Sequence, residues 1–197
     1  MQESTARCHS CTPMKPPPDT KHPLVLRTDF TDDQAWSPLC ALISSPIGRD
    51  GFQAQVTFVD DPSFAGVAPE VLLTCIPGDH PHSFVVIADR ATFSEAEQPM
   101  LVMDLLDQRG RTFRALPTRI QAIENNLSIG NMGFAEFAEA VEGDGIFRRF
   151  PGEKEEEDYS VMTLQRVPVR KKTSPPKTLL GRALIYTYKL LRGKPGA

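Results

Sequence analysis

Short apolar segments alternate with helix-like segments in the middle of the chain, and this alternation constrains the fold more than any other feature. Residues 24–26 and 83–88 are almost continuously apolar, which is typical of strands buried on both faces of a sheet. Residues 52–59 alternate apolar and polar side chains and predict a strand with one wetter face. Helical patterns separate these strands, and the order strand, helix, strand, helix, strand indicates βαβ units.

The second half of the same region adds an antiparallel element. Residues 100–106 and 111–116 are both strand-like, and the turn residues between them predict a hairpin. Helices are expected from Pro117 to about residue 125 and over about residues 134–143. We therefore expect one α/β domain over residues 22–150, with a mixed, largely parallel sheet flanked by helices on both faces.

The two flanks differ in composition from this domain. Residues 1–21 are polar and Pro-rich, which predicts a disordered head. Residues 151–176 are charged and Pro-broken and predict a linker, whereas residues 177–193 are helix-like again. On a helical wheel this last segment is basic and amphipathic, and its candidate contacts to a membrane or a partner protein are Arg182, Lys189, Arg192, Leu180 and Leu184.

Charge divides the chain more sharply than its formal net charge of −3 suggests. Residues 23–150 contain nine arginines, no lysine and 18 acidic residues, and hence carry a formal charge of −9. Residues 166–197 contain nine basic residues and no acidic one. The acidic body argues against nucleic acid as its ligand, and the absence of lysine excludes a Schiff-base or P-loop lysine there. The basic tail predicts an anionic membrane surface or an unidentified protein as its partner.

Cysteine usage and the start of the chain predict a cytoplasmic protein, with peripheral membrane attachment through the tail as an alternative. No secretory apolar segment follows Met1, and no apolar run approaches the length of a membrane span. Free thiols in a reducing compartment are then the expectation. Cys8 and Cys11 form a single CxxC motif, which supplies at most half of a zinc site. We predict no cofactor.

Aspartates stand close to the end of each of the first three predicted strands, at Asp29, at Asp60 and Asp61, and at Asp89. Ligands of parallel α/β sheets bind beyond the carboxyl ends of the strands, and carboxylates are oxygen ligands of the kind that Mg²⁺ prefers. The alternative interpretation is structural, because aspartate is also favoured at turns and helix N-termini and pairs with arginine.

Two further groups are candidates for ligand binding. Glu124, Asn125 and Asn126 could orient a ligand through their carboxylate and amide groups, or could bond to their own backbone. Four arginines could bind a carboxylate or phosphate, or could pair with aspartates of the acidic body, namely Arg27, Arg90, Arg111 and Arg114.

Several motifs of the body resemble those of a family of small bacterial and fungal proteins of unknown function. They are residues 23–30 (PLVLRTDF), 58–62 (FVDDP), 88–90 (ADR), 111–114 (RTFR), 124–131 (ENNLSIGN) and 144–148 (DGIFR). The resemblance covers about residues 23–150 and implies that a domain begins and ends near these two positions. It implies no activity and no catalytic residues.

The body contains no recognisable nucleophile–base pair, metal motif or Gly-rich phosphate loop. The sequence therefore favours a non-catalytic binding or accessory module with an unidentified ligand over an enzyme. One alternative is a small enzyme with a Mg²⁺ site at the strand ends. Another is an adaptor that binds a membrane or partner protein through the basic C-terminal helix.

Overall fold

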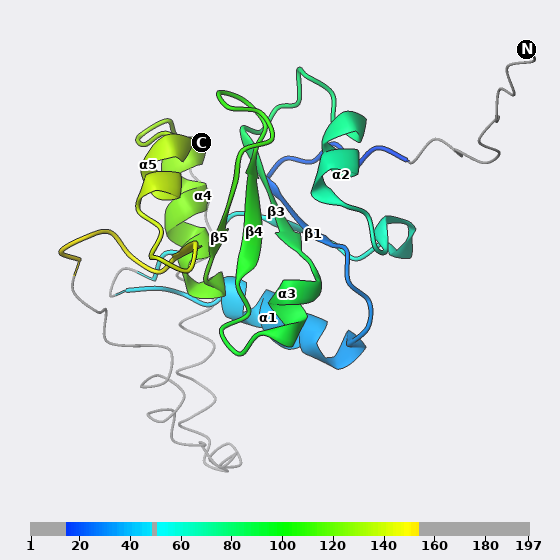
Figure 1. Ribbon diagram of the computed structural model, residues 1–197, viewed down its shortest axis with the longest axis horizontal. Helices are drawn as coiled ribbons and strands as arrows, with labels where there is room; N and C mark the ends of the chain where they lie inside the picture. The colour runs from blue at the N-terminus through cyan, green and yellow to red at the C-terminus, as the bar shows by residue number, and fades with distance from the viewer. Residues whose placement is uncertain (1–14, 49–50, 154–197) are drawn as a thin grey trace, which may run out of the picture. The chain divides into compact units, whose positions relative to one another are not determined.

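A computed structural model describes residues 15–48 and 51–153 of the chain (Figure 1). The predictions made for residues 1–14 and 154–197, including the linker and the basic helix, lie outside the described residues. Within them, residues 15–23 run without regular structure to the first strand. No helix in the described part of the chain is long and apolar enough to span a membrane.

One mixed sheet forms the centre of the domain, with its strands in the order β2-β1-β3-β4-β5-β6. The strands are β1 Leu24–Arg27, β2 Thr57–Val59, β3 Phe84–Ala88, β4 Met100–Asp104, β5 Thr112–Ala115 and β6 Ile146–Phe147. β1 pairs in parallel with β2 and β3, and β6 pairs in parallel with β5. β4 is antiparallel to both of its neighbours, and its pairing with β5 is the predicted hairpin. The predicted α/β class and mixed sheet are confirmed.

Helices cover both faces of the sheet, as the apolar strands predicted (Figure 1). The helices are α1 Asp33–Ile43, α2 Pro69–Cys75, α3 Arg90–Ser94, α4 Ile120–Ser128 and α5 Phe134–Glu139, with 3-10 turns η1 Pro62–Phe64 and η2 Pro117–Arg119. Successive residues of a strand point to opposite faces, so β1 supplies two separate cores. Val25 packs in one core with side chains of α1, α4 and α5, whereas Leu24 and Leu26 pack in the other with side chains of α2 and η1.

The strand predicted over residues 52–59 is shorter than expected. β2 pairs with β1 over three residues only, from Thr57 to Val59. Just before it, the backbone N–H of Gln55 donates to the Glu124 carboxylate at 3.0 Å instead of to a neighbouring strand. The alternating pattern arises there because Ala54 and Val56 pack against the core without strand pairing.

Candidate functional site

The strand-end aspartates lie along one edge of the sheet, because β2, β1 and β3 are adjacent and parallel. Asp29 follows β1, Asp60 and Asp61 follow β2, and Asp89 follows β3. We call the side of the domain at these strand ends the arginine edge, after Arg27 and Arg114, which pair with aspartates there. Arg27 is the more deeply buried of the two.

Asp29 and Asp61 bond to the backbone that follows them. The Asp29 carboxylate, in a residue that is 9% exposed, accepts hydrogen bonds from the Thr31 N–H at 2.8 Å and the Thr31 hydroxyl at 2.5 Å. Burial opposes ionisation of Asp29, but these two bonds and the charges of nearby Arg90 and Arg27 hold its pKa below the ordinary value. Asp61 caps η1 by accepting from the Ser63 N–H at 2.9 Å, and this bond is the main cause of its lowered pKa.

Asp60 pairs with Arg27, whose side chain is only 3% exposed. The Arg27 guanidinium donates to the carboxylates of Asp60 at 3.2 Å and of Asp33 at 2.7 Å. It also donates to the backbone carbonyls of Asp29 at 2.9 Å and Asp32 at 3.1 Å, and it lies 4.4 Å from the centroid of the Phe30 ring. This buried cation is therefore paired, hydrogen-bonded and stacked on an aromatic ring.

Asp89 caps α3 and pairs with an arginine at the same time. Its carboxylate accepts from the Thr92 N–H at 3.2 Å and from both terminal nitrogens of Arg114 at 3.1 and 2.6 Å. Arg90 is exposed next to it, and its charge acts on Asp29. Among the residues that the structure describes, no three His, Cys, Asp or Glu side chains are grouped so that they could hold a metal ion. The placement of these carboxylates gives the Mg²⁺ interpretation no support.

A pocket of about 590 Å³ opens beside Arg27. It is lined by Arg27, Phe30, Asp33, Trp36, Ser37, Asp60 and Pro62. The positive charge in this lining is already compensated by two carboxylates. On α1 nearby, burial and the charge of Asp60 raise the pKa of the Cys40 thiol to about 11.

Glu124, Asn125 and Asn126 lie on α4, away from the aspartates. The Glu124 carboxylate joins α4 to the segment before β2, since it accepts from the Gln55 N–H at 3.0 Å and from the Ser128 hydroxyl at 2.9 Å. The Asn126 amide donates to the Ala122 carbonyl at 2.8 Å and accepts from the Asn131 amide at 2.6 Å. Asn125 is exposed. The Glu124 and Asn126 side chains therefore hold the end of α4 and the loop after it.

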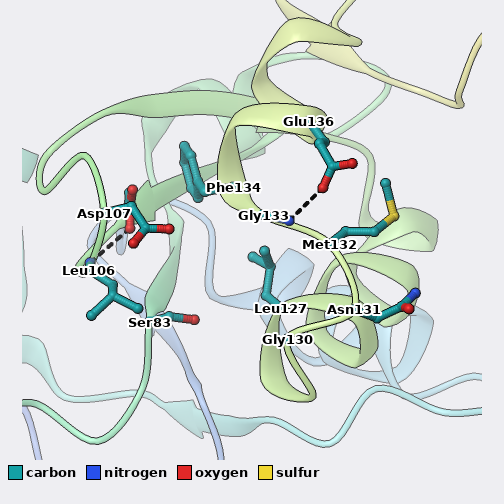
Figure 2. Close-up of a pocket in the computed structure, with 11 residues that line it drawn as sticks. Ser83, Leu106, Asp107, Leu127, Gly130, Asn131, Met132, Gly133, Phe134 and Glu136 are labelled. Atoms are coloured by element: carbon teal, nitrogen blue, oxygen red, sulfur yellow. Dashed lines mark hydrogen bonds between the residues drawn. The ribbon is translucent and has the colours of Figure 1, made fainter.

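A second pocket, of about 270 Å³, lies at the opposite edge of the sheet (Figure 2). The pocket lies at the start of β3, where Phe84 pairs with Asp104 at the end of β4. The arginine edge lies at the other end of β3, where Ala88 pairs with Arg27. The pocket is lined by Ser83, Asp104, Leu106, Asp107, Leu127, Gly130, Asn131, Met132, Gly133, Phe134 and Glu136. We call it the acidic pocket, because it has three carboxylates and no basic side chain in its lining.

Two of these carboxylates are fixed by backbone N–H groups. Asp104 is 1% exposed, and its two oxygens accept from the N–H groups of Leu106 at 2.8 Å and Gln108 at 2.7 Å. Glu136 accepts from the Gly133 N–H at 2.6 Å, a bond drawn in Figure 2. Asp107 is exposed in the β4–β5 turn and has no hydrogen bond or ion pair with any other described residue.

Apolar side chains form the rest of the acidic pocket. In Figure 2, Phe134 and Leu127 lie between the turn that carries Leu106 and Asp107 and the loop that carries Asn131 and Met132. The sequence marked Asp107 as a turn residue and Asn131 as a loop residue, but no linear motif joined them. The lining comes from three stretches of sequence, at Ser83, at residues 104–107 and at residues 127–136, which the pairing of β3 with β4 and the packing of α4 and α5 bring together.

The sequence profile of one protein family, described as a domain of unknown function (DUF6924), matches residues 22–150. These boundaries agree with the predicted domain and with the extent of the motifs that carried the resemblance. No curated protein matches the chain.

Proposed function

This chain belongs to the DUF6924 family, a domain of unknown function, and from the charges at its two sites we propose that residues 22–150 form a non-catalytic binding module. Its ligand enters the acidic pocket between the β4–β5 turn and the α4–α5 loop. The strand-end aspartates of the arginine edge then stabilise the fold and do not contact the ligand.

One observation carries this proposal, namely that charge is compensated at one edge of the sheet and uncompensated at the other. Arg27 faces Asp33 and Asp60, and Arg114 faces Asp89. The lining of the acidic pocket has three carboxylates and no basic side chain. A pocket with an apolar floor and a few fixed polar groups is the usual form of a ligand site, and here those groups still lack an ionic partner.

Small probes test whether the acidic pocket binds anything at all. We add n-butylammonium, n-butanol and n-butyrate separately to the full chain, and we expect at least one of them to shift the NMR resonances of Leu127, Met132 and Phe134. A matched variant, Gly133→Leu, blocks the site: Gly133 has a φ of −90°, and the nearest atom to an added Cβ is a Glu136 oxygen at 3.9 Å. The variant should fold normally and abolish the shifts. If none of the three probes shifts these resonances, the pocket is not a binding site.

The basic C-terminal residues support a second proposal, that the chain attaches peripherally to an anionic membrane surface in the cytoplasm. The supporting observation is the presence of nine basic residues and no acidic one in residues 166–197. Each basic residue near an anionic surface contributes about 1 kcal/mol before screening by salt. Cys40 and Cys75 are free thiols, which is consistent with a reducing compartment.

Vesicle flotation tests this second proposal. Full-length chain should float with phosphatidylserine-containing vesicles, remain behind with pure phosphatidylcholine, and lose binding as salt is added. A chain truncated after Pro176 should not float. Equal behaviour of the two chains would exclude membrane attachment through the tail and would leave a protein partner as the remaining proposal.

A further inference from the structure

Resting on the proposed function, we propose that the ligand of the acidic pocket is a basic side chain, lysine or arginine, presented by an apolar segment of a partner protein. The charge, the size and the rim of the pocket each support this assignment.

The charge of the lining selects a cation. Asp107 and Glu136 contribute exposed carboxylates, Asp104 contributes the charge of a third that is only 1% exposed, and no arginine or lysine lies among the lining residues. The two arginines that follow Asp107 in the sequence are held elsewhere. Arg109 donates to backbone carbonyls of Leu105, Leu73 and Ile76, whereas Arg111 donates to Gln108 and lies 4.0 Å from the Glu139 carboxylate. An entering ammonium or guanidinium group therefore meets carboxylates without displacing a cation of the protein.

The size of the pocket selects one side chain. Its volume of about 270 Å³ lies below the roughly 300–1,000 Å³ that is typical of sites for drug-sized ligands. Lysine and arginine have an apolar stem beneath the charged group, and such a stem packs along apolar surface while the charge stays with polar partners. Phe134, Leu127 and Met132 provide the apolar surface here.

The rim of the pocket selects a protein segment as the source of that side chain. Leu106 in the lining is 67% exposed. A large exposed apolar side chain in the lining of a charged pocket matches an apolar segment that carries one basic residue, because an apolar neighbour of that residue can then cover Leu106.

The carboxylates are held in place before the ligand arrives. Asp104 is fixed by two backbone N–H groups, and Glu136 is fixed by the N–H of Gly133. Binding therefore requires little ordering of the pocket, which favours affinity. Asp107 and Glu136 are both exposed, and Asp107, which makes no such bond, is positioned to attract the basic side chain as it approaches.

A pair of peptides tests the assignment on the full-length chain. In the first, one central arginine is flanked by leucines and by serine-glycine ends, with both termini blocked, so that arginine is the only charge. The second has citrulline, a neutral group of nearly the same shape, in place of arginine. By isothermal titration calorimetry the arginine peptide should bind about tenfold more tightly than the citrulline peptide, which corresponds to about 1.4 kcal/mol.

Variants locate the effect. Asp107→Asn and Glu136→Gln should each weaken the arginine peptide by about threefold to tenfold and leave the citrulline peptide unchanged, because each removes one charge and keeps the shape. Leu106→Ser should weaken both peptides equally. The matched control is Glu70→Gln, an exposed carboxylate in the first turn of α2, which should change neither affinity.

Two results would overturn the assignment and still leave the pocket as a binding site. In one, the citrulline peptide binds as tightly as the arginine peptide and Gly133→Leu abolishes both. In the other, butyl probes shift the pocket resonances but neither peptide binds. If Gly133→Leu has no effect on any of these ligands, the proposed function fails together with the assignment.

Discussion

Both edges of the sheet carry carboxylates, but the edges differ in what faces these groups. At the arginine edge, Arg27 pairs with Asp33 and Asp60 and Arg114 pairs with Asp89, all within 3.2 Å, and Asp29 and Asp61 bond to the backbone that follows them. In the acidic pocket, Asp104 and Glu136 bond only to backbone N–H groups, and Asp107 has no partner among the described residues.

This difference separates two roles that look alike in the sequence. A carboxylate paired with a buried cation contributes to stability, and its removal leaves that cation without a partner. A carboxylate that faces no cation stabilises the fold only through its hydrogen bonds, and its charge remains available to a ligand. Neutralising charges at the two edges should therefore have different, and in part opposite, effects on the free energy of unfolding.

The largest effect is expected for Arg27→Met at the arginine edge. The substitution removes two ion pairs and the donors to the buried carbonyl of Asp29 and the part-buried carbonyl of Asp32, while the exposed carboxylates of Asp33 and Asp60 can be rehydrated. We expect the free energy of unfolding to fall by about 2–4 kcal/mol, measured by urea denaturation. Arg90→Met is the matched control, because Arg90 is exposed at the same edge, and it should have a much smaller effect. Equal losses in the two variants would show that burial of Arg27 is irrelevant.

A smaller loss is expected at Asp89, which combines a helix cap with an ion pair. Asp89→Ala removes both and should lower the free energy of unfolding by about 1–2 kcal/mol. Asp89→Asn keeps an oxygen that can accept from the Thr92 N–H and loses only the charge towards Arg114. It should therefore lose roughly half as much in the same urea measurement. A larger loss for Asn than for Ala would contradict this division.

The placement of the strand-end aspartates and their pairing with arginines could be predicted from the sequence, but which arginine pairs with which aspartate could not. Apolar runs and the residues that end them are local features, so the positions of β1 and β3 and of Asp29 and Asp89 at one edge followed from the pattern. Arg114 reaches Asp89 from a strand 25 residues later, and no local pattern encodes such a pair.

Short elements and the acidic pocket were missed for related reasons. α3 has five residues and is held by a capping box between Asp89 and Thr92, while β6 has two residues and exists through its pairing with β5. Neither is long enough to show a period. The acidic pocket is assembled from separate segments that strand pairing and helix packing bring together.

Acid should weaken the arginine edge through Asp29. Its pKa in the folded chain lies below the ordinary 3.8, so its ionised form stabilises the fold above about that pH. This contribution is lost as pH falls from about 4 through the lower pKa of the folded state. In urea titrations from about pH 6 to pH 2.5, Asp29→Asn should show a shallower loss of stability than the natural chain. Parallel curves for the two chains would contradict the assigned shift.

The smallest expected change, and the one of opposite sign, is at the acidic pocket. Asp107→Asn and Glu136→Gln each remove one of three like charges that no basic side chain separates, and the amide oxygen introduced by Glu136→Gln can still accept from the Gly133 N–H. The urea midpoint should therefore stay the same or rise slightly, and any rise should disappear at high salt, because salt screens repulsion between exposed carboxylates. Asp60→Asn is the matched comparison at the arginine edge, where the lost carboxylate pairs with Arg27 and the midpoint should fall. If Asp107→Asn lowers the midpoint as much as Asp60→Asn, then Asp107 has a structural partner after all, and the uncompensated charge on which the proposed ligand site depends does not exist.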